Sequence, residues 1–288
     1  MTTLSITQGQ AKQVKRLTED AVDRAIAEGI LDKDGLQRLI ENGDELQADI
    51  VASIRRLSLS NQYADEEEES NYGYLSGYKP KSMTEQTNFL RQLIPDIGYA
   101  NEKLAEQPLP QGAEGYFAIP RWQKIAPTYG EALQKVLDLI KQTRDGKFYN
   151  YREGQLGSDR LRQHAKTAKV GAKLGQEQEG YDILVVPCQF GIKHRGRSVR
   201  RAREVMNAQE FGLGAFAVAC MILTHPERLK HYDDLWIDCA GDEYDPVADG
   251  SFGGAPIFSF GGGGVGFGGD YVGIADGDCG AASGFVPQ

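Results

Sequence analysis

The sequence predicts a layered α/β or α+β protein, with an N-terminal helical hairpin and a glycine-rich C-terminal β subdomain. Three observations support this fold class. Helical and extended patterns alternate from about residue 84 onward, which is typical of a sheet flanked by helices. Residues 181–192 (YDILVVPCQFGI) form a continuous apolar run of the kind that is buried on both faces of a sheet. The last forty residues combine short aromatic runs with glycine clusters, as strands joined by tight turns do.

Residues 1–60 predict the helical hairpin. Apolar side chains recur at helical spacing in two series, at 14–26 and 36–57, with Gly29 between them and Gly43 as a candidate break in the second. Two helices are too small to bury both apolar stripes by themselves, so the stripes need a partner. That partner is either the rest of the chain or a second copy, and the second alternative predicts a homodimer.

Residues 61–83 predict a linker. The segment ADEEEES at 64–70 carries four consecutive glutamates, which cannot enter a core, and the glycine, proline and serine that follow favour a mobile connection. Residues 84–288 then form the α/β domain, with the glycine-rich β tail starting at about residue 250.

The elements of the α/β domain follow from hydrophobic periodicity. The expected helices are 84–94, 129–144, 159–175, 199–206 and 208–223, and the expected strands are 115–120, 147–151, 181–192 and 235–239. Asn207 and Glu210 have the spacing of a capping box at the start of the last helix. This helix is apolar nearly all round, so we expect it in the centre of the core.

Charge is distributed unevenly along the chain. The formal net charge is −9, yet IKHRGRSVRRAR at 192–203 has seven side chains of twelve that are or can be cationic. From Tyr232 to Gln288 there are ten Asp or Glu and no Lys or Arg, so the preceding residues sum to −9 + 10 = +1. This balance argues against nucleic-acid binding by the whole surface and leaves local binding by a basic patch open.

The basic segment predicts an anion site. It follows the strand at 181–192, and Ser198 can cap the helix at 199–206, whose free N–H groups and positive dipole end favour an anion. The candidate ligands are Lys193, His194, Arg195, Arg197, Ser198, Arg200 and Arg203. Salt bridges to the acidic tail are the alternative, although exposed pairs contribute only about 0–1 kcal/mol each. A protein partner is a further alternative.

Aromatic residues lie beside basic ones in two places, and this pattern slightly favours the interpretation that the anion is nucleic acid or a nucleotide. Trp122 follows Arg121, and Tyr149 and Tyr151 precede Arg152. Such rings can stack on bases. Half-buried strands require the same alternation of aromatic and polar residues.

A second candidate site lies in IDCAGDEYDP at 237–246. Asp238, Asp242, Glu243 and Asp245 cluster at the end of an expected buried strand, where α/β proteins commonly place ligands. Oxygen ligands of this kind suit Mg²⁺, and the candidate ligands are Asp238, Asp242 and Glu243. A metal beside an arginine-rich phosphate site would serve phosphoester chemistry. The alternative is that these carboxylates are solvated loop residues or helix caps.

The cysteines and the apolar segments indicate the cellular compartment in which we expect the protein. Four cysteines lie far apart without CxxC spacing, so we expect reduced thiols. Cys188 is either a core residue or a nucleophile paired with His194 or His164. The longest apolar stretch, 211–223, is too short to cross a bilayer and the N-terminus has no apolar signal core, so we expect a cytoplasmic protein without membrane contact.

Three functions follow from these patterns. The first is a phosphate-binding or anion-binding protein associated with nucleic acid through the basic segment. The second is a Mg²⁺-dependent phosphoesterase or nucleotidyl transferase that uses the carboxylates at 238–243. The third is a non-catalytic interaction or assembly protein that docks through its N-terminal helices.

Overall fold

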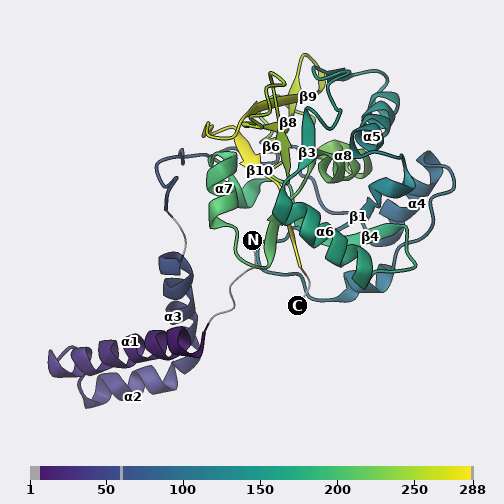
Figure 1. Cartoon of the computed structure of the whole chain (residues 1–288). Helices are drawn as coiled ribbons and strands as arrows, with labels where there is room; N and C mark the ends of the chain where they lie inside the picture. The colour runs from purple at the N-terminus through teal and green to yellow at the C-terminus, as the bar shows by residue number, and fades with distance from the viewer. Residues whose placement is uncertain (1–6, 59–60, 287–288) are drawn as a thin grey trace. The chain divides into compact units, whose positions relative to one another are not determined.

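The structure is a computed structural model that describes residues 7–58 and 61–286. Contacts divide the chain into two compact units, Met1–Leu59 and Ser60–Gln288, and each is described by itself (Figure 1). In the described part of the chain, none of the helices is both long enough and apolar enough to span a membrane.

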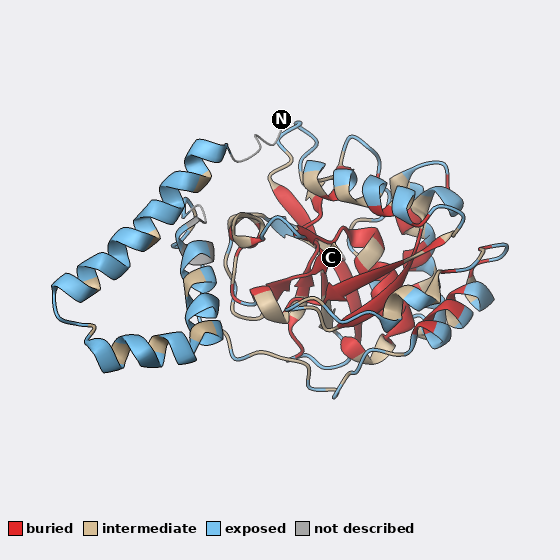
Figure 2. Ribbon diagram, turned by 90° about the horizontal axis from the view of Figure 1, so that it is seen from below, coloured by how far each residue is buried: buried red, intermediate tan, exposed pale blue. Residues whose placement is uncertain are grey.

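The first unit consists of three helices. They are α1 (Gln8–Ala27), α2 (Lys33–Glu41) and α3 (Gly43–Ser58). The side chains of Thr7 and Asp32 cap α1 and α2, and Asn42 ends α2 where the sequence suggested a break. No described residue of this unit is buried (Figure 2). Eleven of its large apolar side chains are 38–72% exposed and Leu31, Leu39 and Ile50 are half-buried, so the unit has no buried core among these residues.

The second unit is built on two sheets. The first has the order β1-β4-β11-β5 and is antiparallel throughout, with β1 (Gly115–Pro120), β4 (Ile183–Gln189), β5 (Glu210–Gly212) and β11 (Ser283–Phe285). The second contains β2 (Phe148–Asn150), β3 (Leu161–Gln163), β6 (Trp236–Asp238), β7 (Asp242–Tyr244), β8 (Gly254–Gly261), β9 (Gly264–Tyr271) and β10 (Cys279–Ala281). Strand β8 pairs with β9, β6 and β7, so the glycine-rich hairpin β8–β9 is the middle of this sheet.

Helices cover the sheets and confirm the predicted α/β or α+β class. They are α4 (Met83–Leu93), α5 (Tyr129–Thr143), α6 (Ala165–Glu177), α7 (Val199–Val205) and α8 (Ala215–Thr224). Short 3₁₀ turns η1 to η4 lie at Glu102–Glu106, Trp122–Lys124, Ile192–His194 and Pro226–Arg228. Helix α8 is buried along nearly its whole length between α5 and β1, as its uniform apolarity predicts.

Two expected helices begin with a strand instead. Residues 161–163 pair as β3 with β7, and residues 210–212 pair as β5 with β11. The capping role predicted for Glu210 is therefore wrong, because Glu210 lies in β5 and α8 begins after Gly214. Both errors concern three-residue strands whose partners are distant in sequence, so local periodicity carries no signal for them.

Candidate functional site

The basic segment leads from β4 into α7 through η3. Ser198 is the N-cap of α7, and its hydroxyl accepts a hydrogen bond from the Arg201 backbone N–H at 3.1 Å. Val199, Ala202 and Met206 pack against Ala255 and Ala281 of the second sheet. The strand, cap and apolar face predicted from the sequence are all present.

An acidic strap, residues 61–70, lies along this basic segment. Glu66 accepts hydrogen bonds from the Arg200 guanidinium and, at 2.6 Å, from the Ser198 hydroxyl. Glu67 pairs with Arg197 at 3.3 Å and with Arg201 at 2.6 Å. These pairs lower the pKa of both glutamates, Glu66 chiefly through Arg200 and Glu67 against its own burial.

The backbone of the strap is also held. Glu68 N–H donates to the Gly196 carbonyl at 2.6 Å, and Ser198 N–H donates to the Glu66 carbonyl at 3.2 Å. A Cβ at Gly196, whose φ is +72°, would lie 2.1 Å from the Glu68 carbonyl oxygen, so this approach requires glycine. The segment expected to be a mobile linker thus belongs to the second unit, where residues 66–68 pair with residues 196–201.

A buried carboxylate holds the start of the basic segment. Glu210 accepts from His194 Nε2 at 2.7 Å and from the Ser283 hydroxyl at 2.7 Å, and it forms an ion pair with Lys193. Arg197 Nη1 lies 3.2 Å from His194 Nδ1, which keeps that nitrogen unprotonated. Burial lowers the pKa of His194, so the imidazole is neutral and Lys193 is the matching cation. Burial acts to raise the pKa of Glu210, but the hydrogen bonds from His194, Lys193 and Ser283 outweigh it and lower this pKa to about 2.

The two remaining cationic candidates, Arg195 and Arg203, donate hydrogen bonds to backbone carbonyl groups. Arg195 Nη1 donates to the Tyr72 carbonyl at 2.9 Å. Arg203 donates from Nε and Nη2 to the carbonyls of Ala240 and Asp242 at 2.8 and 2.6 Å. Every candidate anion ligand therefore has a partner inside the chain, and the acidic partners come from 66–67 and 210 rather than from the C-terminal tail. A phosphate would compete with Glu66 and Glu67, and nucleic-acid binding here stays a prediction.

The three predicted magnesium ligands do not converge. Glu243 lies on β7 and forms an ion pair with Arg162 Nε of β3 at 2.7 Å. Asp242 precedes it and faces the other side of the sheet, where it is fully buried. Asp238 is buried on β6. Among the described residues, the one acidic cluster with metal-ligand spacing is Asp276, Asp278 and Cys279.

Asp242 forms a buried pair with Tyr129. The Tyr129 hydroxyl donates to the carboxylate at 2.8 Å, and the Ala215 N–H at the start of α8 donates at 2.7 Å. Burial raises the pKa of Asp242 to about 7, against the lowering effect of these two donors and of Arg203. The same burial and the Asp242 charge raise the pKa of Tyr129. The pair anchors the Tyr129 ring.

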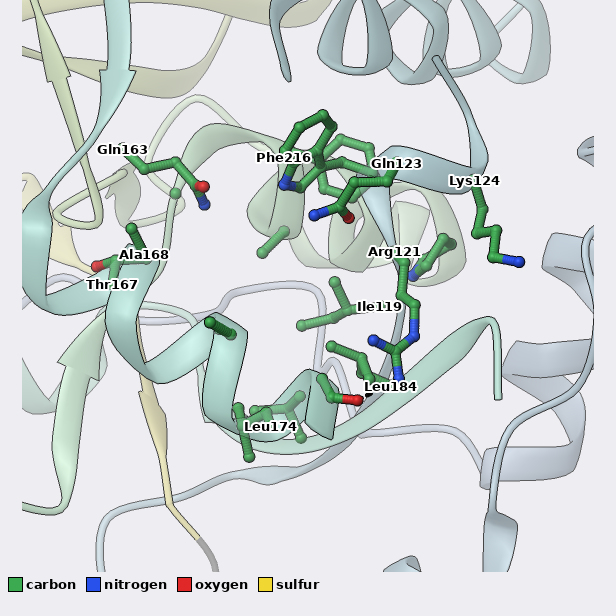
Figure 3. A pocket seen from close by; sticks show the side chains of 18 of the residues that line it. Ile119, Arg121, Gln123, Lys124, Gln163, Thr167, Ala168, Leu174, Leu184 and Phe216 are labelled. Carbon is green, nitrogen blue, oxygen red and sulfur yellow. Dashed lines mark hydrogen bonds between the residues drawn. The ribbon is translucent and has the colours of Figure 1, made fainter. Parts of the chain in front are cut away.

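Tyr129 lines a cleft of about 720 Å³ between α6 and the first sheet. Figure 3 shows this cleft with Ile119, Ala168 and Phe216 among its labelled residues. Ile119 and Leu184, from β1 and β4, line its floor. On the α6 side the lining alternates small residues, Ala168, Gly171, Ala172 and Gly175, with the larger Thr167, Leu174 and Gln176. A Cβ built on Gly171 meets nothing within 4 Å. The cleft exists because these side chains cannot fill the space between helix and sheet.

One wall of the cleft is aromatic. The ring centroids of Trp122 and Tyr129 lie 6.0 Å apart with an interplanar angle of 86°, and Phe216 lies 6.2 Å from Tyr129. The amides of Gln123 and Gln163 point into the cleft from opposite sides (Figure 3). Neither amide has a hydrogen-bond partner among the described residues, so both are free to bind a ligand.

Three of the charged groups at the rim, Arg121, Lys124 and Asp182, are paired within the chain, and the fourth, Glu179, is exposed. Arg121 donates to the carbonyls of Gly175 and Gln178 at 2.7 Å each, near the C-terminal end of α6, and to that of Tyr181. Lys124 and Asp182 form an ion pair at 3.0 Å. The lining therefore has two cations and two anions, which sum to zero formal charge, together with a partly aromatic surface.

The other candidates from the sequence have structural roles. Cys188 is fully buried in β4, its thiol donates to the Val186 carbonyl at 3.4 Å, and burial raises its pKa, so it is not a thiolate. All four cysteines are free and buried. Tyr149 donates to the Gly262 carbonyl at 3.2 Å beside the β8–β9 turn. Of the predicted stacking residues, Trp122 lies in the cleft.

The cleft itself was not predicted from the sequence. Its signals were the small side chains of α6 at helical spacing and the aromatic residue in GYFAIPRWQK, but the space between them depends on how α6 sits on the sheet. No protein-family model, curated protein or solved structure matches this chain.

Proposed function

We propose that the second unit binds a small, planar, nitrogen-containing aromatic molecule, with the size and edge pattern of a nucleobase, in the cleft beside α6. The observation that carries this proposal is the meeting of an aromatic wall with two unpartnered amides in an open cleft. The cleft volume lies within the range of roughly 300–1,000 Å³ that is typical of small-molecule sites.

The chemistry of the lining selects the ligand class. A carboxamide offers both a donor and an acceptor in one plane, so Gln123 and Gln163 suit a ring whose edge alternates acceptors and N–H groups. Trp122 supplies a face or edge for ring contact. Because Arg121 and Lys124 are already paired, the lining favours a neutral ring over an anion.

We assign binding rather than a reaction to this cleft. Among the hydroxyl groups of the lining residues, that of Tyr129 has its pKa raised, by burial and by the charge of Asp242. This hydroxyl donates its hydrogen bond to Asp242 and not to a group in the cleft. Thr167 donates to the Gly212 carbonyl at 2.8 Å. Of the described lining residues, none pairs a free nucleophile with a base.

The two tryptophans give a direct test. Trp122 lies in the cleft and Trp236 lies on β6, so only the Trp122 indole N–H signal should shift when ¹⁵N-labelled protein is titrated with adenine, guanine and cytosine. Gly171→Leu adds a side chain to the lining at a position where a Cβ meets nothing within 4 Å, and it should abolish the shift. Lys169→Leu, on an exposed position of the same helix, is the control and should leave the shift unchanged.

Two results would overturn the proposal. One is that neither the three bases nor a library of neutral heteroaromatic fragments shifts the Trp122 signal. The other is that Gly171→Leu binds them as the parent does.

We propose a second function, homodimeric assembly through α1, because the first unit exposes its apolar side chains. The argument for a second copy as the partner is charge. Lys12, Lys15 and Arg16 lie in the first half of α1, and Glu19, Asp20 and Asp23 lie in the second half. Antiparallel pairing of two α1 helices about residues 17 and 18 places each of these three basic groups opposite an acidic one, whereas Arg24 falls opposite Ala11.

Light scattering tests the assembly. The full chain should be a dimer, and a chain that lacks residues 1–59 should be a monomer of unchanged thermal stability. The truncation must stop before residue 61, because the strap that follows pairs with Arg197, Arg200 and Arg201. A monomeric full chain would contradict the proposal.

A further inference from the structure

The cleft beside α6 is longer than the planar ring proposed for it. Thr167 and Gln176 both line the cleft, and their separation along the axis of α6 is about 14 Å at the rise of an α-helix. Figure 3 shows Gln163 and Thr167 near one end of α6 and Leu174 near the other. A nucleobase is one ring or two fused rings, so it covers part of this length and leaves the remainder for a substituent.

The ring belongs at the end of the cleft where α6 begins. The register of β3 and β7 sets Gln163 opposite Asp242, and Asp242 accepts the hydrogen bond of the Tyr129 hydroxyl at 2.8 Å. The rings of Trp122 and Phe216 lie 6.0 and 6.2 Å from that of Tyr129. The aromatic wall and the Gln163 amide therefore lie together at this end.

The opposite end of the cleft offers hydroxyl and carboxylate groups. Arg121 identifies this end, because it donates to the Gly175 and Gln178 carbonyls where α6 finishes. Glu179 and Tyr181 line the cleft here. Within residues 7–58 and 61–286, neither the Glu179 carboxylate nor the Tyr181 hydroxyl has a hydrogen-bond or ion-pair partner. These two groups favour a substituent that donates hydrogen bonds.

The charges at this end select against a phosphate on that substituent. Arg121 donates to carbonyl groups, and Lys124 forms an ion pair with Asp182 at 3.0 Å. Glu179 would oppose a phosphate because both are negative. A carboxylate can accept hydrogen bonds from two neighbouring hydroxyls, such as those of ribose. A neutral substituent that carries hydroxyls therefore fits this end best.

We propose that the ligand of the cleft is a nucleoside, with its base at the Gln163 end and its ribose hydroxyls at Glu179 and Tyr181. This inference rests on the proposed function, because it extends the same site from the ring to the substituent. It predicts an order of affinity. A ribonucleoside binds more tightly than its free base, which lacks the sugar contacts, and more tightly than its 5′-monophosphate, which Glu179 repels.

Titration of the ¹⁵N-labelled full chain, followed at the Trp122 indole N–H, tests this order. The ligands are adenine, guanine and cytosine, their ribonucleosides, their 2′,3′-dideoxynucleosides and their 5′-monophosphates. For a base that binds, the ribonucleoside should bind about tenfold more tightly, because its hydroxyls donate to a charged acceptor. The dideoxynucleoside lacks these hydroxyls and should bind as the base does.

A pair of variants on neighbouring carboxylates isolates the sugar contact. Glu179→Ala changes an exposed side chain and should remove the preference for the ribonucleoside while base affinity is unchanged. Glu177→Ala is the matched control, because Glu177 is exposed, pairs with Lys173 and lies outside the cleft lining. It removes the same charge and should keep the preference.

The inference and the proposed function fail on different results. Bases that bind as tightly as their ribonucleosides, or a preference that survives in Glu179→Ala, would overturn the inference and leave the proposed function intact. Tighter binding of a monophosphate, or of 9-(3-aminopropyl)adenine, than of adenosine would also overturn it, because the substituent would then be selected by charge. If none of the compounds shifts the Trp122 signal, both fail.

Discussion

The pKa values of buried acidic side chains shift in opposite directions in this protein, and the direction depends on the groups that donate hydrogen bonds to them. Glu210 receives three donors, one of them the Lys193 ammonium, and its pKa falls to about 2. Asp242 receives two neutral donors in a fully buried position, and its pKa rises to about 7. The two residues therefore predict pH effects of opposite sign.

Asp242→Asn should become more stable relative to the parent as pH rises. A folded-state pKa above the unfolded value of 3.8 means that the parent loses stability between pH 3.8 and about 7, by up to about 1.4 kcal/mol per pH unit. Asparagine has no such titration. Urea unfolding of both proteins from pH 5 to pH 8.5 measures the difference, and a difference that does not change with pH contradicts the assignment.

Glu210→Gln should show the reverse trend. The depressed pKa of Glu210 stabilises the fold above its unfolded value of 4.5, and this stability is lost as pH falls toward 2. At pH 7 the substitution leaves Lys193 without its charge partner and should cost about 2–4 kcal/mol. Ser283→Ala removes one neutral donor from the same carboxylate and should cost less. Equal losses at pH 7 and at pH 4 would count against this explanation.

At the scale of elements, hydrophobic periodicity was sufficient to predict the bounds of an element wherever that element buries a continuous apolar face. The strand at 115–120 and the helix at 129–143 were predicted within one residue, because their apolar positions follow a single period. The three-residue strands β3 and β5 were missed because their register is set by β7 and β11, which lie far away in sequence.

The candidate site was less predictable than the fold, for two physical reasons. The charge of the basic segment was visible in the sequence, but its partners were not, because pairing of 192–203 with 66–67 is a property of tertiary structure. The cleft could not be predicted from the sequence, because it depends on how α6 packs on the sheet. It forms where α6 has Gly171 and Ala168 instead of larger side chains.

Removal of the strap charges tests what the basic segment does. Glu66→Gln with Glu67→Gln should lower the melting temperature by about 2–4 °C, because Arg197 and Arg200 lose their ion-pair partners and Arg201 keeps only Glu204. The matched control is Glu68→Gln with Glu69→Gln. It removes the same charge from side chains with no ion pair in the described chain, and its melting temperature should stay at the parent value.

The same pair of variants tests the predicted nucleic-acid binding. If phosphates and the strap compete for the arginines, the Glu66 and Glu67 variant should bind single-stranded RNA more tightly than the control variant, with a steep salt dependence. Fluorescence anisotropy at two salt concentrations measures both. Absence of binding in the parent and in both variants would assign the basic segment to internal charge matching alone.

At the scale of the whole molecule, the two units differ in how they satisfy their apolar surface. The second unit buries its core in two sheets and five helices, whereas the first exposes its apolar side chains. Helices of 9–20 residues without tertiary packing are marginal in water. A second copy of the chain supplies packing that the described part of the first unit lacks.

Charge reversal on α1 tests that partner directly. Lys12, Lys15 and Arg16 changed to Glu give one variant, and Glu19, Asp20 and Asp23 changed to Lys give another. In antiparallel pairing each variant alone sets like charges opposite each other, so each should be monomeric at low salt and regain dimer as salt screens the repulsion. An equimolar mixture should form a heterodimer, and a chain with all six changes should dimerise as the parent does. Light scattering reads all four samples, and dimers in both single variants at low salt would show that α1 charges do not face each other across an interface.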